Sequence, residues 1–160
     1  MKLKTGDKLP DVTFMQMGPD GPCPVSTTDE FSGKRVAVFA VPGAFTPTCS
    51  AKHLPGYLEH ADKLGDKGID KIACLSVNDV FVMDAWGKAQ GVGDKIDMLA
   101  DGNCAFAEKI GLELDGSGFG MGRRSQRYAM VVNDGVVEKI FVEEGGEFKV
   151  SSAEYMLAHL

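Results

Sequence analysis

Two segments of the chain are nearly continuous runs of apolar and β-branched residues, Arg35–Val41 and Lys71–Val77. Such runs are typical of strands that are buried on both faces of a sheet. Farther along, Tyr128–Val132 and Val136–Val142 flank Asn133-Asp134-Gly135, whose Asp-Gly step favours a tight turn, and the pair predicts a β-hairpin. Shorter strand candidates are Asp11–Phe14 and Met98–Ala100.

Segments with apolar residues at helical spacing alternate with these strands. The predicted helices are Cys49–Leu64, Asp79–Gln90, Ala105–Ile110 and Ser152–Leu160. This order predicts an α/β protein with a central mixed β-sheet flanked by helices on both faces, and a thioredoxin-like fold fits it. The 160 residues are enough for one sizeable core, so we expect a single domain over residues 1–160.

Composition and charge argue against several classes of function. The formal net charge is −6 with no basic run, which argues against a nucleic-acid interface and against an anionic membrane surface. No apolar run approaches the roughly 20 residues that span a bilayer. Met1–Asp7 reaches charge and glycine before any apolar stretch, unlike a secretory signal, so we expect a cytoplasmic protein. The three histidines are scattered and no Cys/His spacing is typical of zinc, so neither a metal nor a cofactor is expected.

Among the four cysteines, no two form a Cys-x-x-Cys pair, and Cys49 has the most informative surroundings. A buried strand ends at Val41, a Pro/Gly/Thr turn follows, and the predicted helix begins near Cys49. The carboxyl ends of central strands usually carry the sites of such sheets. A helix N-terminus also offers unpaired N–H groups and partial positive charge, which stabilise a thiolate. The pattern alone leaves two interpretations open, a reactive thiolate and an inert buried thiol.

A longer motif surrounds this cysteine. The stretch Pro42-Gly43-Ala44-Phe45-Thr46-Pro47-Thr48-Cys49 resembles the active-site signature of the peroxiredoxins, Pro-x-x-x-Thr-x-x-Cys. The similarity runs over nearly the whole chain and points to the group of animal peroxiredoxin 5 and plant type II peroxiredoxins. The supporting stretches are His53-Leu54-Pro55-Gly56, Ser76-Val77-Asn78-Asp79, Phe81-Val82-Met83, Ala85-Trp86 and Arg127-Tyr128-Ala129-Met130-Val131-Val132.

The resemblance implies a thiol peroxidase that reduces hydrogen peroxide and alkyl hydroperoxides. Cys49 would attack the peroxide and become a sulfenic acid, Thr46 would hydrogen-bond the substrate and the thiolate, and Pro42 would shield the site. Arg127 would stabilise the thiolate and orient the peroxide, although residue types alone do not separate it from Arg123 and Arg124. The resemblance also implies a homodimer that packs near the active site.

The sulfenic acid must be reduced before it oxidises further. Animal members carry a resolving cysteine near the C-terminus, where this chain reads Phe148–Ser152 without a thiol. Cys74 stands where plant members have a second cysteine and is the candidate resolving residue, but its apolar strand favours a buried, inert thiol. Cys23, in an expected exposed turn, and Cys104 are interpreted as bystanders. The simplest cycle uses Cys49 alone, reduced by glutathione with glutaredoxin or by thioredoxin.

Two other functions are alternatives to peroxide reduction. A thiol–disulfide oxidoreductase usually needs Cys-x-x-Cys, and here Thr46 takes the first position. A peroxide sensor or holdase would use Cys49 without multiple turnover. The alternating glycines within Asp115–Gly122 fit no nucleotide-binding motif and predict a flexible loop beside the site or an interface. His53, one helical turn after Cys49, is expected to be a surface or capping residue rather than a general base.

Overall fold

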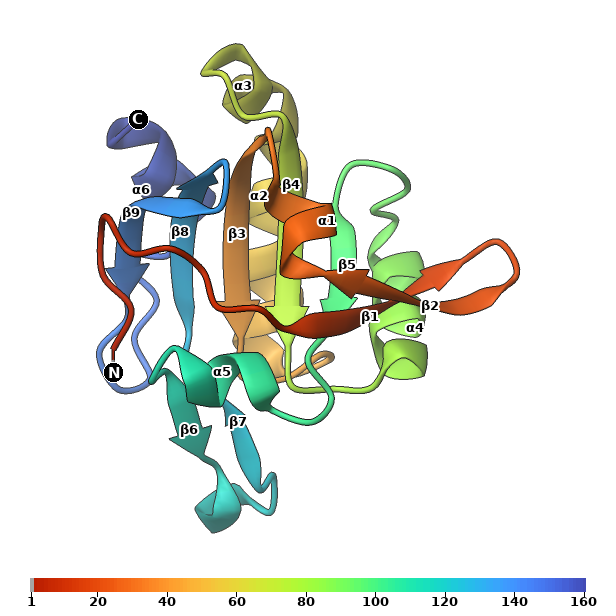
Figure 1. Cartoon of the computed structure of the whole chain (residues 1–160). Coiled ribbons are helices and arrows are strands. Elements are labelled where there is room, and N and C mark those ends of the chain that lie inside the picture. The colour runs from red at the N-terminus through yellow and green to blue at the C-terminus, as the bar shows by residue number, and fades with distance from the viewer. Residues whose placement is uncertain (1) are drawn as a thin grey trace.

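A seven-stranded mixed sheet forms the centre of the computed structural model, which describes residues 2–160 (Figure 1). The strand order is β2-β1-β5-β4-β3-β8-β9, and a separate two-stranded ribbon pairs β6 with β7. The strands are β1 (Thr13–Gly18), β2 (Gly21–Ser26), β3 (Arg35–Val41), β4 (Lys71–Ser76), β5 (Asp97–Ala100), β6 (Glu113–Asp115), β7 (Arg123–Ser125), β8 (Tyr128–Asn133) and β9 (Val136–Val142). The helices are α1 (Thr27–Phe31), α2 (Leu54–Glu59), α3 (Ala61–Asp66), α4 (Val80–Gln90), α5 (Ala105–Lys109) and α6 (Ala153–Ala158), with a π-helical turn η1 (Cys49–His53) and a 3₁₀ turn η2 (Ser117–Phe119).

Strand β3 is an interior strand of the sheet, between parallel β4 and antiparallel β8. Its register pairs Ala40 with Leu75 of β4 and with Tyr128 of β8. The carboxyl end of β3 therefore lies beside the amino end of β8. This pairing brings the segment after Val41 next to the residues that precede Tyr128, although the two are far apart in sequence.

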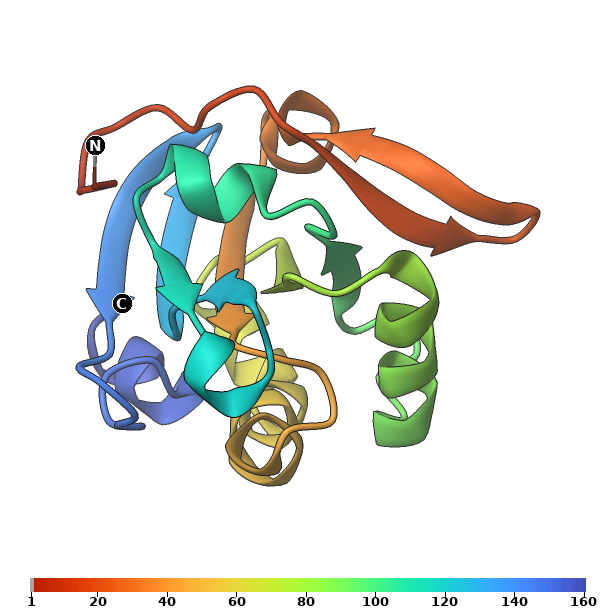
Figure 2. The same cartoon turned by 90° about the horizontal axis from the view of Figure 1, so that it is seen from below.

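Two hydrophobic layers cover the two faces of the sheet, because successive side chains of a strand point to opposite sides. On one face, Phe39 packs with residues of α2, α4 and α6, including Tyr57 and Trp86. On the other face, Val38 packs with residues around α1 and α5, including Phe106. Figure 2 shows these two layers edge-on, with α5 and α1 on one side and α2 and α6 on the other. The predicted mixed sheet with helices on both faces is confirmed.

Most predicted elements are present with boundaries that differ by a few residues. The turn of the β8–β9 hairpin has positive φ at Asp134 (49°) and Gly135 (79°), as a tight Asp-Gly turn requires. The predicted strand Asp11–Phe14 is shifted to β1. Within the described residues no helix is both long and apolar enough to cross a membrane.

The predicted helix Cys49–Leu64 is wrong as a single element, since the chain forms η1, α2 and α3 there. Pro55 has no N–H to donate to the preceding turn, and η1 instead closes a wider turn in which the Leu54 N–H bonds the Cys49 carbonyl. His60 leaves helical geometry (φ −97°, ψ 13°) and separates α2 from α3.

The hydrophobic pattern did not predict the short strands β2, β6 and β7 or the turn η2. Cys23 lies in β2, an exposed edge strand, and not in a turn; the prolines on either side are tolerated because an edge strand can leave donor positions unused. The predicted loop Asp115–Gly122 contains η2, which lies between the ribbon strands β6 and β7. Periodicity could not reveal β6 and β7, because each strand is only three residues long.

Candidate active site

Cys49 lies where the sequence places it, at the end of the turn that follows β3. The backbone becomes helical at Pro47, so Cys49 is in the first turn of the helical segment and opens η1. Its side chain is fully buried, with 0% exposure. A buried thiol in apolar packing is normally inert, so the polar atoms that contact the sulfur decide between the two interpretations.

Arg127 supplies that polar contact. Its Nη2 donates a hydrogen bond to Cys49 Sγ at 3.1 Å, and its Nη1 donates to His53 Nδ1 at 2.7 Å. A guanidinium at hydrogen-bond distance stabilises a thiolate more than a thiol, and the dry surroundings strengthen that preference. The buried sulfur therefore has a cationic hydrogen-bond donor beside it, the kind of partner that activates a nucleophilic cysteine.

The other two arginines lie elsewhere. Arg123 is exposed and forms an ion pair with Glu108 at 2.6 Å. Arg124 donates from Nε to the Met121 carbonyl at 2.9 Å, and its Nη1 lies 3.5 Å from the Pro42 carbonyl oxygen. Of the three arginines, Arg127 is thus the one that bonds to the sulfur.

His53 is not the surface residue that the sequence suggested. It is fully buried, and burial together with the Arg127 charge lowers its pKa to about 3. The neutral ring donates from Nε2 to the Ser151 carbonyl at 3.0 Å, which leaves Nδ1 without a proton to accept from Arg127. His53 thereby orients the guanidinium. Its spacing of four residues from Cys49 was the available signal, but the burial that gives it this role depends on the tertiary fold.

Thr46 lies at the site but does not donate to the sulfur. Its Oγ1 donates to the Gly43 carbonyl at 2.7 Å, because the tight turn brings that carbonyl within reach of the single hydroxyl proton. The Oγ1 oxygen can still accept a hydrogen bond, and Thr46 lines a cavity that Pro42 also lines. A peroxide O–H would find an acceptor there, whereas the expected hydrogen bond from Thr46 to Cys49 is not present in this structure.

This cavity has a volume of about 720 Å³ and adjoins Cys49 through Thr46, Thr48 and Arg127. The β6–β7 ribbon and its η2 turn form one wall, so the predicted glycine-rich loop lies beside the site. The segment after β9 forms another wall. The full lining is Pro42, Thr46, Pro47, Thr48, Leu114, Asp115, Gly116, Phe119, Met121, Arg124, Gln126, Arg127, Glu143, Gly145, Gly146 and Glu147. Phe119 is 87% exposed, so the mouth of the cavity has an apolar edge.

Two side chains that the sequence did not single out hold the Cys49 loop in place. Asn78 Oδ1 accepts from the Ala44 N–H at 3.0 Å and from Ser76 Oγ at 2.5 Å. Trp86 Nε1 donates to Ser50 Oγ at 3.0 Å, one residue after the sulfur. The bonds to Ala44 and Ser50 join segments more than 30 residues apart, so no local pattern in the sequence predicted them.

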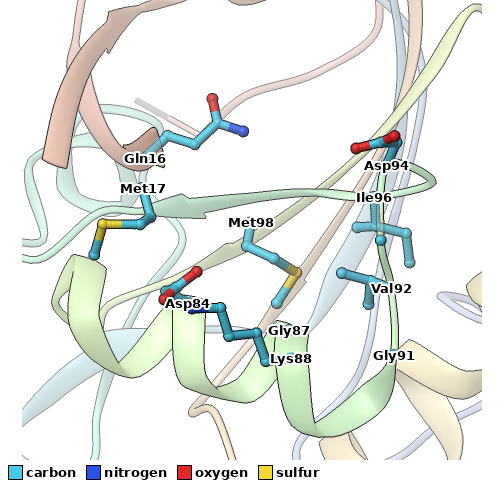
Figure 3. Close-up of a pocket in the computed structure, with 11 residues that line it drawn as sticks. Gln16, Met17, Asp84, Gly87, Lys88, Gly91, Val92, Asp94, Ile96 and Met98 are labelled. Carbon is cyan, nitrogen blue, oxygen red and sulfur yellow. Dashed lines mark ion pairs between the residues drawn. The ribbon is translucent and has the colours of Figure 1, made fainter. Parts of the chain in front are cut away.

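A second groove, of about 530 Å³, lies between α4 and strands β1 and β5 (Figure 3). Asp84 and Lys88 form an ion pair of 3.0 Å on its wall, and Met17 and Met98 add apolar surface. None of the predicted site residues lines it. In residues 2–160, no group of three or more His, Cys, Asp or Glu side chains is placed to hold a metal ion.

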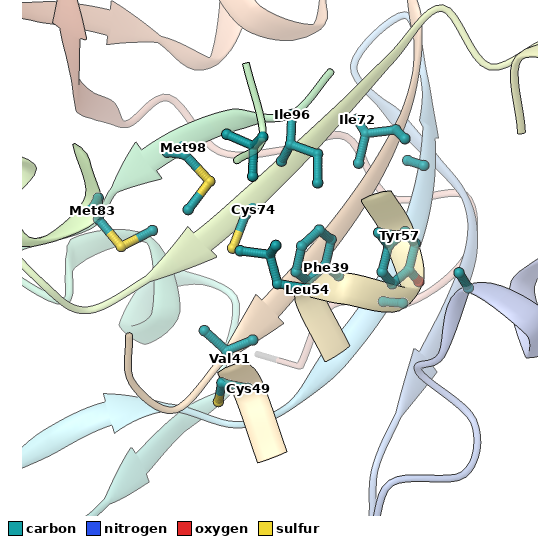
Figure 4. Packing of buried hydrophobic residues seen from close by; sticks show 14 of the residues in the cluster. Phe39, Val41, Cys49, Leu54, Tyr57, Ile72, Cys74, Met83, Ile96 and Met98 are labelled. Carbon is teal, nitrogen blue, oxygen red and sulfur yellow. The ribbon is translucent and has the colours of Figure 1, made fainter. Parts of the chain in front are cut away.

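Cys74 is buried in the middle of β4, as its apolar run predicted. Burial raises the pKa of its thiol well above the usual range, with Cys49 adding to the shift and Arg127 opposing it. Figure 4 shows Val41 between the two cysteines in that view. Cys104 is also buried, and burial raises its pKa. All four cysteines are free thiols.

Comparisons with known proteins agree on the family that this chain resembles. The model of the redoxin family matches residues 4–157. Chloroplastic peroxiredoxin-2E of Arabidopsis thaliana is 51% identical over 162 residues, covering 99% of this chain and 69% of the relative. Peroxiredoxin-2B of Arabidopsis thaliana is 44% identical, covering 99% and 98%. The crystal structure of reduced Prx3 in complex with hydrogen peroxide from Vibrio vulnificus superposes with a TM-score of 0.95 at 51% identity, covering 98% of each chain.

Proposed function

Because the chain belongs to the redoxin family, as a peroxiredoxin, we propose that Cys49 is the nucleophile of its peroxidase reaction. Peroxiredoxins are thiol-dependent peroxidases, and this activity is the function of the chain. The observation that carries the assignment of Cys49 is its contact with Arg127: a guanidinium nitrogen 3.1 Å from a sulfur in the first turn of a helical segment, beside a cavity.

The first half of the reaction is a displacement at oxygen. The Cys49 thiolate attacks one peroxide oxygen, an S–O bond forms, and the O–O bond breaks. The cysteine is oxidised to a sulfenic acid, and the second oxygen leaves as alkoxide or hydroxide and takes a proton from water. Arg127 lies where it can donate to the oxygens as negative charge develops, and the Thr46 oxygen can accept a hydrogen bond from the peroxide O–H.

The second half restores the thiolate with two equivalents of an external thiol. One thiol condenses with the sulfenic acid, releases water and leaves a mixed disulfide on Cys49; a second thiol breaks that disulfide. Glutathione with glutaredoxin, or thioredoxin, is the proposed donor. The absence of a thiol at Phe148–Ser152 and the burial of Cys74 support this single-cysteine cycle.

The proposed assembly follows the same family resemblance. We propose a homodimer, and apolar side chains exposed near the site, Phe45 and Phe119, support a protein contact there. The cytoplasmic location stays a prediction.

The test is peroxide consumption by the wild-type chain with glutaredoxin and glutathione, and with thioredoxin, in parallel with Cys49→Ser. We expect many equivalents to be consumed by the wild type with at least one donor and none by Cys49→Ser. Consumption that stops near one equivalent with every donor would instead favour a sensor, and turnover by Cys49→Ser would refute the assignment of the nucleophile.

A further inference from the structure

Glu143 follows β9 and lies directly across from Arg127. The Glu143 N–H donates to the Arg127 carbonyl at 3.0 Å, which continues the β8–β9 pairing by one residue pair. Opposite charges at such cross-strand positions normally attract. Yet in residues 2–160 no ion pair joins the two side chains, because the Glu143 carboxylate bonds to other donors.

Four donors converge on one oxygen of Glu143. Its Oε2 accepts from the N–H groups of Lys149 (2.8 Å), Val150 (2.9 Å) and Ser151 (2.8 Å), and from Ser151 Oγ (2.6 Å). The residue is buried, so these charge-assisted bonds are strong and costly to lose. They fix the backbone of residues 149–151 and, at the same time, occupy a carboxylate oxygen that would otherwise compete with Cys49 for the guanidinium.

The fixed segment presents one carbonyl to the site. The Ser151 carbonyl oxygen accepts from His53 Nε2 at 3.0 Å and from the Tyr57 hydroxyl at 2.8 Å. Because His53 is neutral, its single ring proton must stay on Nε2 to make this bond. Loss of the carbonyl from this position would free the ring to carry its proton on Nδ1, which would then face the Arg127 donor instead of accepting from it.

We propose that Glu143 is a positioning residue, which holds Arg127 against the Cys49 sulfur through Ser151 and His53. The proposal rests on the proposed function of Cys49 and extends it to Glu143, which makes no hydrogen bond to the sulfur. It assigns a role in the reaction to the segment after β9, which the sequence marked only by its lack of a thiol.

Simple electrostatics makes the opposite prediction, which gives the test its direction. A carboxylate near a thiolate disfavours the negative charge on sulfur, so deleting that carboxylate should increase the thiolate population. If Glu143 acts by positioning, the same deletion lets Arg127 move and the thiolate population falls.

The experiment compares Glu143→Ala and Glu143→Gln with wild type. The amide retains an acceptor oxygen for the 149–151 segment and should rescue part of the effect. Glu144→Ala is the matched control, because Glu144 is the exposed neighbour with the same charge and no side-chain hydrogen bond among those of the described residues. The thiolate population is measured at neutral pH as the ultraviolet absorbance difference between each protein and its Cys49→Ser counterpart. The rate of the first reaction with hydrogen peroxide is followed by the fluorescence of Trp86, the only tryptophan, as a function of pH.

We expect the thiolate population and the peroxide rate to decrease in the order wild type, Glu143→Gln, Glu143→Ala, with Glu144→Ala unchanged. The rate of Glu143→Ala should fall by about tenfold or more, since displacement of a catalytic group by ~1 Å can cost on the order of 100-fold. If Glu143→Ala does not fold, by circular dichroism, Glu143→Gln carries the test alone.

A folded Glu143→Gln with an equal or larger thiolate population and a rate within about twofold of wild type would overturn the proposal. A wild-type chain that shows thiolate absorbance but no reaction with peroxide would refute the proposed function of Cys49, while the absorbance comparison would still decide the role of Glu143. The two failures are therefore distinguishable.

Discussion

Arg127 Nη2 and Cys49 Sγ lie 3.1 Å apart although 78 positions separate the two residues in sequence. The pairing of β3 with β8 produces this proximity: Ala40 is opposite Tyr128, so the residue before Tyr128 lies beside the turn that leads from Val41 to the sulfur. The Cys49 sulfur and its guanidinium partner thus lie at the adjacent ends of two antiparallel strands, and the paired strands fix their separation.

Arg127→Gln should reduce the rate of peroxide reduction by about tenfold to 100-fold. A hydrogen bond to a charged group contributes ~1.5–3 kcal/mol, and about 1.4 kcal/mol corresponds to a factor of ten. The thiolate absorbance at neutral pH should fall as well. Arg127→Lys should give an intermediate rate, because lysine keeps the charge but not the fork that contacts Cys49 and His53 together.

The control for this variant is Arg123→Gln, which removes the same charge from an exposed position on β7. Its rate should equal that of the wild type. Equal rates for Arg127→Gln and Arg123→Gln would contradict a role for Arg127 at the sulfur.

Cys74→Ala should leave turnover with an external thiol within about twofold of wild type. The raised pKa of Cys74 keeps it a neutral thiol near neutral pH, and the neutral form is a poor nucleophile. Loss of the sulfur from the packed core should lower the free energy of unfolding by on the order of 1 kcal/mol, measured by urea denaturation. Turnover that disappears with glutathione, glutaredoxin and thioredoxin alike would show that Cys74 resolves the sulfenic acid.

Gly43→Ala should slow the reaction with peroxide by about threefold to tenfold, because the cavity wall must move. A Cβ at this position would lie 3.1 Å from Arg124 Nη1, 3.1 Å from Thr46 Cγ2 and 3.2 Å from Met121 Cε. All three atoms belong to side chains that can shift, so stability should change little while the cavity next to Thr46 changes shape. Steady-state kinetics and a thermal melt measure the two effects.

Gly65→Ala is the corresponding control, since a Cβ there meets no atom within 4 Å. An unchanged peroxide rate in Gly43→Ala, with its fold intact, would mean that this wall of the cavity does not contact the substrate.

Glu30→Gln should make the free energy of unfolding less dependent on pH. Burial, and then the neighbouring Asp97 carboxylate, raise the pKa of Glu30 to about 7, with Lys71 opposing the shift. The folded state therefore binds a proton more tightly than the unfolded chain, whose glutamates titrate near pH 4.3. The resulting contribution favours the folded state at low pH and is lost as pH rises from about 4.5 to about 7. The wild type should lose on the order of 1–2 kcal/mol more than Glu30→Gln between pH 5 and pH 8.

Urea unfolding at pH 5 and pH 8 measures this difference, and Glu138→Gln serves as the control. A hydrogen bond from Arg35 lowers the pKa of Glu138, so its contribution is lost only as pH falls below this range. The same pH 5 to pH 8 difference in wild type and Glu30→Gln would contradict the prediction.

The sequence determined those elements whose burial or turn geometry shows in a contiguous run of residues. Strand β3 is an unbroken apolar run because both of its faces pack against helices. The Asp134-Gly135 step specifies the turn of the β8–β9 hairpin without help from the rest of the fold. The signature from Pro42 to Cys49 is likewise contiguous. These features sufficed for the mixed sheet and the family, whereas the three-residue strands β6 and β7 carry too few residues for any period to appear.

Only the tertiary structure decided which groups surround the sulfur. Arg123, Arg124 and Arg127 are equivalent as residue types, and strand register brings Arg127 to Cys49. His53 looked like a surface residue because burial is a property of the assembled layers and not of its neighbours in sequence. Glu143 carried no periodic signal, since its four donors lie on Lys149, Val150 and Ser151, in an irregular loop that turns back after β9. Hydrogen bonds between distant segments leave no periodic trace in the sequence, and for that reason the chemistry of the site could be located from the sequence but its supporting contacts could not.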